Sequence, residues 1–224
     1  MIKLEKGAAP NILIEKSAEW TAALLSKIHS GEKPTDAEKG RYRHPEIKQE
    51  LIKETAGKCA YCESKLTHIA YGDIEHIIPK SSTPEKSFDW ENLTLACDIC
   101  NTQKGANVIN EHVFIDPYLV DPAKHFYFAG PLLMTWPGSE AAKLTEILLD
   151  LNRTPLFEKR KEKIDYLAAL VESCHKAKNP VLKRVLLEDM RNNELLGDKE
   201  YTALARCFLD PLIMRLEADL IMNV

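Results

Sequence analysis

Apolar residues near the start of the chain recur at the three- and four-residue spacing of an amphipathic helix. Residues 11–30 show this pattern, and Gly31 ends it. After a polar connector, a second helical pattern begins at Pro45, which suits a first helical turn, and stops at Gly57. The sequence therefore predicts two helices ahead of residue 58.

The pattern then changes to short alternation. Apolar and polar residues alternate in DIEHIIP, residues 73–79, and in NLTLAC, residues 92–97, as they do in half-buried strands. Residues 106–138 are irregular and hold four of the twelve prolines. This stretch predicts one or two strands laid against the preceding segment.

Helical periodicity returns after residue 138 and predicts a C-terminal bundle. The helix N-cap signals are Ser139, Thr154 before Pro155, Asn179 before Pro180, Asp198, and Asp210 before Pro211. The predicted fold is therefore α+β and mostly helical. We expect an N-terminal helical arm and connector (1–44), a central module that contains the strands (45–138) and a C-terminal helical domain (139–224).

Composition and charge restrict the function. The chain has 224 residues, 45% of them hydrophobic, enough for one sizeable core or two small ones. Thirty Lys and Arg against 34 Asp and Glu give a net charge of −4, so the chain lacks the positive field needed to hold nucleic acid unaided. No apolar stretch approaches the roughly 20 residues of a membrane span, and charges interrupt the N-terminus where a signal peptide is apolar. We expect a cytoplasmic protein without membrane contact.

One stretch departs from this acidic balance. Residues 153–191 hold ten Lys or Arg against six Asp or Glu. The basic cluster is Lys159, Arg160, Lys161 and Lys163. A solvated helix face, with acidic residues interleaved, is favoured over a surface that steers phosphates.

Four of the six cysteines form two Cys-x-x-Cys turns, Cys59 with Cys62 and Cys97 with Cys100. Zn²⁺ prefers four tetrahedral ligands, and two such turns supply four thiolates, so the spacing predicts a structural zinc site. Four buried thiols without metal, and a redox dithiol, are the disfavoured alternatives. The other two cysteines, Cys174 and Cys207, stand alone in helical patterns and are expected to fill the core.

The segment between the two turns carries the second chemical pattern. An acidic residue precedes a histidine in Glu75-His76, and an Asn directly follows the last cysteine. This order and spacing resemble the HNH nuclease family in its zinc-knuckle form, over residues 57–107. The matching residues are Glu75, His76, Pro79, Asn92, Cys97, Cys100, Asn101, Lys104 and Gly105.

The resemblance implies a ββα-metal module, in which a hairpin and a helix enclose one divalent ion. His76 resembles the general base of the family, a role that suits a side chain with an ordinary pKa near 6.5. Glu75 and Asn101 resemble the ligands of the catalytic ion, and a carboxylate there favours Mg²⁺ or Mn²⁺. Asn92 resembles the asparagine that braces the loop and orients the histidine.

Lys80 and Lys104 are the candidate phosphate contacts, although capping the C-terminus of the knuckle helix explains Lys104 equally well. Many family members have His where this chain has Asn101, a weaker neutral ligand. Asn107 and Asn110 are the alternative candidates for this ligand of the catalytic ion, whereas Asp73 is interpreted as a polar residue at the start of a strand. The other histidines match no motif position and are not expected to bind metal: His29, His44, His68, His112, His125 and His175.

The wider chain is similar to the HNH subunit of Septu-type and retron-linked bacterial anti-phage systems. The similarity lies in the opening MIKLEKGAAP, a tryptophan-bearing helix and the later IDP and DPAKHFYF blocks. In those systems a larger ATPase of the SMC or ABC kind accompanies the HNH protein. The resemblance therefore implies a partner that supplies nucleotide binding and much of the affinity for nucleic acid. The apolar segment 1–30 is either a docking arm for this partner or packs on the chain's own C-terminal bundle.

Three functions remain open at this point. The favoured one is a metal-dependent endonuclease that acts on DNA within a defence complex. The second is the same catalyst acting on RNA, because a site that contacts phosphate does not by itself distinguish the sugars. The third is a zinc-knuckle adaptor that binds without cutting. The presence of Glu75, His76 and Asn101 argues against the adaptor, because a scaffold needs no general base beside a metal ligand.

Overall fold

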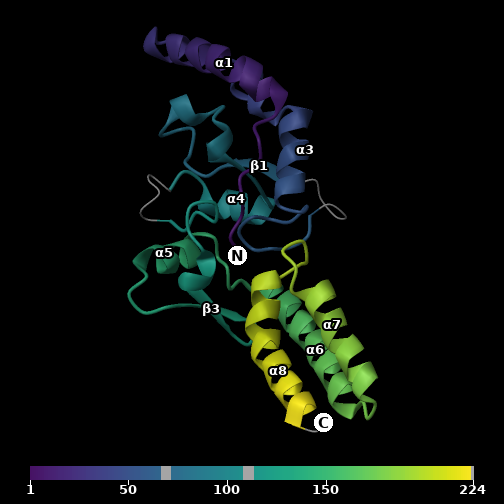
Figure 1. Ribbon diagram of the computed structural model, residues 1–224. Coiled ribbons are helices and arrows are strands. Elements are labelled where there is room, and N and C mark those ends of the chain that lie inside the picture. Colours follow the sequence, from purple (N-terminus) through teal and green to yellow (C-terminus); the bar gives the residue numbers. More distant parts are fainter. Residues whose placement is uncertain (67–71, 108–113, 223–224) are drawn as a thin grey trace.

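The computed structural model describes residues 1–66, 72–107 and 114–222, and Figure 1 shows an elongated molecule with α1 at one end and a three-helix bundle at the other. The helices described are α1 (Asn11–His29), α2 (Asp36–Lys39), α3 (Pro45–Glu54), α4 (Asp98–Lys104), α5 (Glu140–Leu148), α6 (Thr154–Lys176), α7 (Pro180–Glu194) and α8 (Thr202–Met222). Short 3-10 turns are η1 (Arg41–Arg43), η2 (Pro84–Lys86), η3 (Trp90–Asn92) and η4 (Pro122–Lys124). The mixture of helices and small sheets confirms the predicted α+β class.

The two N-terminal helices confirm the sequence pattern. Gly31 has φ of 77° just after α1, and Gly57 has φ of 69° after α3, a backbone conformation that glycine adopts without steric cost. Pro45 stands at the first helical position of α3, where its missing N–H leaves no hydrogen bond unmade. The chain then enters the first cysteine turn directly.

The central sheet consists of two antiparallel strands, β1 (Asp73–His76) and β2 (Leu93–Ala96). Their register pairs Glu75 with Thr94 and His76 with Leu93. Neighbouring side chains point to opposite faces of a strand, so the side chains of the two motif residues Glu75 and His76 point to different faces. A second antiparallel pair, β3 (Phe126–Ala129) and β4 (Leu132–Thr135), confirms the strands predicted within 106–138.

Two hydrophobic cores organise the chain. The first contains residues from all three predicted segments, among them Leu13, Leu95 and Leu151. The second lies within α6, α7 and α8, side by side in Figure 1, and confirms the predicted C-terminal bundle. The boundaries at residues 44 and 138 stay a prediction. Among the described residues, no helix is long and apolar enough to cross a membrane.

Segment 1–30 packs mainly on the central module, and its first residues also lie against the start of α8. The Trp20 ring meets that of Phe88, with centroids 5.5 Å apart, and Leu24 is buried in the first core. The α-amino group of Met1 forms a buried ion pair with Glu63 at 2.5 Å. These apolar side chains have partners within the chain, whereas Ile14 and Ile28 of the same segment are exposed, so the docking arm stays a prediction.

The N-terminal ends of the helices after residue 138 agree only in part with the predicted N-caps. Ser139 and Asn179 precede α5 and α7, and the Asn179 side chain accepts from the backbone N–H of Val181. Thr154 is the first residue of α6 rather than its N-cap. Neither Asp198 nor Asp210 starts a helix, because α8 begins at Thr202 and continues through Pro211. Leu209 and Ile213, on either side of the proline, are both buried in the second core, so tertiary packing outweighs the local break.

The expectation for one of the lone cysteines needs correction, and that of a solvated basic helix face is confirmed except at Arg160. Cys174 is buried in the second core as predicted, whereas Cys207 is exposed. In the basic cluster, Lys159 and Lys161 pair with acidic residues on the exposed face of α6. Arg160 is instead buried, and its Nη1 donates to the carbonyl oxygen of Leu151 at 2.7 Å. The cluster is therefore not a continuous basic surface.

Candidate active site and zinc knuckle

The four cysteines of the two turns converge on one point. Their Sγ atoms all lie within 4.8 Å of one another, and those of Cys62 and Cys97 are 3.9 Å apart. Tetrahedral zinc with Zn–S bonds of about 2.3 Å holds its sulfurs about 3.8 Å apart. The donor set, its spacing and its burial therefore fit a structural zinc ion.

The fold positions the two turns through β2. In the first turn, the backbone N–H of Ala60 donates to the carbonyl oxygen of Leu95. In the second, Cys97 is the N-cap of α4, and its Sγ accepts from the Cys100 N–H at 3.3 Å. Burial raises the pKa of the Cys59 thiol well above its ordinary value, so a cation is needed to keep it as a thiolate.

Arg153 reaches this sulfur cluster from the start of α6. Its Nη2 lies 3.7 Å from the Cys100 Sγ and 4.0 Å from the Cys97 Sγ, and its Nη1 lies 3.8 Å from Cys100. Four thiolates around Zn²⁺ leave a net negative charge, which the guanidinium offsets. Sequence reasoning missed this residue, because no local pattern marks a cation that is brought to the knuckle by tertiary folding.

His76 ends β1 and is buried, and its Nε2 lies 2.9 Å from the backbone carbonyl oxygen of Ser87. A carbonyl oxygen can only accept, so Nε2 carries the hydrogen, and in the neutral ring Nδ1 holds the free lone pair. Burial lowers the pKa of His76 from 6.5 to about 4; the Ser87 hydrogen bond opposes this, while nearby cations including Lys80 add to it. The ring is therefore a neutral, oriented base at pH 7.

Asn92 is buried and braces the loop after β1. Its Oδ1 accepts from the Ile78 N–H at 2.7 Å, and its Nδ2 donates to the carbonyl oxygens of Ile78 and Lys86. Ser87, which holds the His76 ring, directly follows Lys86. These contacts fit the predicted bracing role, and Asn92 is linked to His76 through this loop, by way of the Ser87 carbonyl.

Glu75 and Lys104 form a buried ion pair beneath the sheet. The Lys104 Nζ donates to Glu75 Oε1 at 2.5 Å and to the carbonyl oxygen of His76 at 2.8 Å. The expectation that Lys104 contacts phosphate or caps α4 is wrong, because its side chain is fully buried in these two contacts. Burial raises the pKa of the Glu75 carboxyl, and the Lys104 ammonium counteracts the rise.

Asn101 contacts Asp73 rather than the ion pair. Its Nδ2 donates to Asp73 Oδ2 at 3.0 Å. Asp73 and Glu75 are two positions apart on β1 and so share one face of the strand, but Asp73 is exposed where Glu75 is buried. Asn107 lies just beyond α4, whereas Asn110, His68 and His112 fall outside the described residues.

Lys80, the other predicted phosphate contact, is half-buried beside His76. Its Nζ donates to the phenolic oxygen of Tyr42 at 2.8 Å. The Tyr42 ring packs edge-on against the His76 ring, with centroids 4.5 Å apart. Tyr42 precedes the HNH-like segment, so no motif in the sequence marks it.

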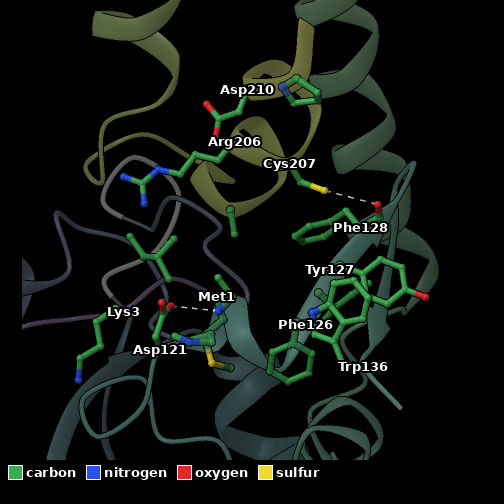
Figure 2. A pocket seen from close by; sticks show the side chains of 16 residues that line it. Met1, Lys3, Asp121, Phe126, Tyr127, Phe128, Trp136, Arg206, Cys207 and Asp210 are labelled. Atoms are coloured by element: carbon green, nitrogen blue, oxygen red, sulfur yellow. Dashed lines mark hydrogen bonds between the residues drawn. The ribbon is translucent and has the colours of Figure 1, made fainter. Parts of the chain in front are cut away.

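A larger cavity, of about 520 Å³, lies away from this site, between the N-terminal residues, the β3–β4 hairpin and α8. Figure 2 shows its aromatic side, formed by Phe126, Tyr127, Phe128 and Trp136. Arg206 and Asp210 of α8 add charge to its lining. No residue predicted from the sequence for catalysis or metal binding is part of this lining.

Comparisons with known proteins agree with this geometry. The HNH endonuclease family model matches residues 59–107, so the chain carries an HNH endonuclease module there. Septu protein PtuB of Bacillus thuringiensis is 30% identical over 126 residues, which are 56% of this chain and 45% of the relative. Septu protein PtuB of Bacillus mycoides is 24% identical over 194 residues, 71% of this chain and 66% of the relative. The matched regions thus span roughly half to two thirds of these relatives.

Proposed function

We propose that the protein is a metal-dependent HNH endonuclease that hydrolyses phosphodiester bonds of nucleic acid, with DNA as the main substrate. The observation that carries this proposal is His76: a buried, neutral imidazole whose Nε2–H is fixed by the Ser87 carbonyl. Such a ring keeps Nδ1 free to accept a proton. A merely structural zinc knuckle has no need of that arrangement.

His76 acts as the general base. Its Nδ1 takes the proton of the water that attacks the phosphorus, and the Ser87 hydrogen bond keeps the ring in the required tautomer. Asn92 preserves this orientation by holding the loop that carries Ser87. Lys80, which donates to the hydroxyl of the tyrosine packed against the imidazole, supplies positive charge to the phosphate.

The catalytic ion would be held by Glu75 and Asn101, with Asp73 beside them. Carboxylate and amide oxygens are the donors that Mg²⁺ and Mn²⁺ prefer, so the residues present fit such an ion. When bound, it would stabilise the charge that develops on the phosphate and the leaving 3′ oxygen. The buried Lys104 ammonium favours the ionised form of the Glu75 carboxylate, which a hard cation requires, and so opposes the rise in pKa caused by burial.

The proposed setting is a bacterial anti-phage defence complex with an ATPase partner of the SMC or ABC kind, in the cytoplasm. The similarity to Septu protein PtuB supports the defence setting. The net charge of −4 supports the partner, because productive binding of a polyanion then needs positive surface from elsewhere. RNA cleavage and a non-cutting adaptor are the alternatives.

The test is to incubate the purified protein, alone and with the ATPase subunit of the same system, with plasmid DNA or total RNA. Each reaction is run in Mg²⁺, Mn²⁺ or EDTA, with His76→Ala as the control. Metal-dependent DNA cutting that His76→Ala abolishes supports the proposal. Cutting of RNA alone favours the second function, and binding without any cutting favours the adaptor.

A further inference from the structure

Part of the candidate active site comes from outside the HNH module. Tyr42 belongs to η1, which precedes the matched segment 59–107. Its buried ring meets the His76 imidazole at a centroid distance of 4.5 Å and an interplanar angle of 78°. Such edge-to-face packing restricts the tilt of both rings. The connector between α1 and α3 therefore forms one wall around the predicted base.

Two cations gather on the same tyrosine. The Lys80 Nζ lies 4.2 Å from the centre of the Tyr42 ring and donates to its hydroxyl, and the Arg43 guanidinium carbon lies 5.2 Å from that centre. Within the described part of the chain, neither Arg43 nor Lys80 makes an ion pair, in contrast to the nearby Lys104. Two cations on one side chain, with no carboxylate of the described residues at ion-pair distance from either, favour binding of an anion beside them.

A small cavity adjoins this wall. It measures about 240 Å³ and is lined by Tyr42, Arg43 and Lys48 from the connector and α3, and by Asp73 and Asn101 from the HNH module. Of the two cations on Tyr42, Arg43 thus lines a cavity that also contains predicted metal donors, whereas Lys80 is outside this lining and reaches the site through its hydrogen bond to the Tyr42 hydroxyl. A phosphodiester bound to a divalent ion needs both kinds of group around it.

From these contacts we infer that Arg43 and Lys80 bind the phosphate group that His76-activated water attacks, and that Tyr42 is the positioning residue that holds both Lys80 and the imidazole. The inference rests on the proposed function and adds the connector to the active site. Arg43 contributes a planar guanidinium that can donate two hydrogen bonds to phosphate oxygens, whereas Lys80 contributes a point charge.

The test compares Arg43→Gln and Lys80→Met with Arg41→Gln in the full chain with its ATPase partner. Arg41 is the matched control: it lies on the same 3-10 turn as Arg43, but its guanidinium lies over the Trp20 ring, 5.7 Å from the ring centre, whereas Arg43 and Lys80 lie over Tyr42. We expect kcat/KM for DNA cleavage to fall at least about tenfold in each test variant and to change little in the control. Arg43→Lys should recover part of the loss.

Binding provides a readout that does not depend on cutting. In the His76→Ala background, the slope of log affinity for duplex DNA against log salt should become less steep by about 0.9 when Arg43 is replaced by Gln. If both test variants cleave and bind like the control, the inference is overturned while the proposed nuclease stands. If the wild-type protein cuts nothing, the proposed function fails, and the salt slope alone then supports or overturns the phosphate contact.

Tyr42→Phe tests the positioning role. This change keeps the ring against His76 and removes only the hydroxyl that holds Lys80. If the hydroxyl acts through Lys80, Tyr42→Phe combined with Lys80→Met should be no slower than Lys80→Met alone. Additive losses at an unchanged melting temperature would contradict that role.

Discussion

Lys104 and Glu75 form an ion pair in which both side chains are buried and the Nζ–Oε1 distance is 2.5 Å. Lys104 lies on α4 and Glu75 on β1, so the pair ties the helix of the module to its sheet. Lys104 also donates to the backbone carbonyl of His76. One buried ammonium therefore holds the predicted metal ligand and the backbone of the predicted base at once.

The first prediction is that Lys104→Met lowers the free energy of unfolding by about 3–5 kcal/mol, because it leaves the Glu75 carboxylate buried without a partner. Chemical denaturation of the zinc-loaded protein measures the change. Lys53→Met is the matched control, since its exposed pair with Glu50 contributes at most about 1 kcal/mol. Equal losses in the two variants would contradict the importance of the buried pair.

The second prediction is one tightly held zinc per chain at Cys59, Cys62, Cys97 and Cys100. Because the ion links the first turn to α4, Cys97→Ser should remove the zinc and unfold the module rather than only slow turnover. Elemental analysis and thermal melting measure both effects, with Cys207→Ser as the control. A zinc-free wild-type protein whose melting curve matches that of Cys97→Ser would rule out the site.

The third prediction is that His76→Ala leaves zinc content and folding intact while lowering cleavage at least about a hundredfold, the scale of a lost general base. His76 lies outside the cysteine cluster, so zinc retention separates loss of the base from loss of the fold. Single-turnover cleavage and elemental analysis on the same preparation make the measurement. Cleavage at the wild-type rate would show that another group activates the water.

The parts of the site that sequence could predict are those set by local spacing. Cys59 with Cys62, and Cys97 with Cys100, lie three residues apart, and the hydrogen bond from the Ala60 N–H to the Leu95 carbonyl oxygen on β2 brings the two turns together. Tyr42 was missed because its contact with His76 depends on how the connector folds back over the module. The predicted contact of Lys104 with phosphate failed because sequence does not reveal which side of α4 is buried.

The fourth prediction concerns Arg153, whose guanidinium approaches two of the four sulfurs. Arg153→Gln removes the charge that offsets the thiolates, so a chelator should extract zinc at least about tenfold faster. Arg191→Gln serves as the control, because Arg191 pairs with Glu217 on the exposed bundle. Identical release rates in the two variants would show that Arg153 does not stabilise the zinc thiolates.

The last prediction distinguishes the donors of the catalytic ion. Asp73 and Glu75 lie on one face of β1, and Asn101 donates to Asp73, so we expect both carboxylates and the Asn101 amide oxygen to bind the ion. Asp73→Asn and Glu75→Gln should then each raise the Mg²⁺ concentration for half-maximal cleavage at least about tenfold, since each removes a charged oxygen ligand.

Excess Mn²⁺ should restore part of the activity in both variants, because the defect lies in metal capture and not in proton transfer. Asp98→Asn is the matched control: Asp98 lies in the first turn of α4 and is exposed. An unchanged Mg²⁺ requirement in Asp73→Asn, together with a raised one in Glu75→Gln, would limit Asp73 to orienting the Asn101 amide. The reverse result would assign Glu75 to the ion pair with Lys104 alone and make Asp73 the carboxylate ligand.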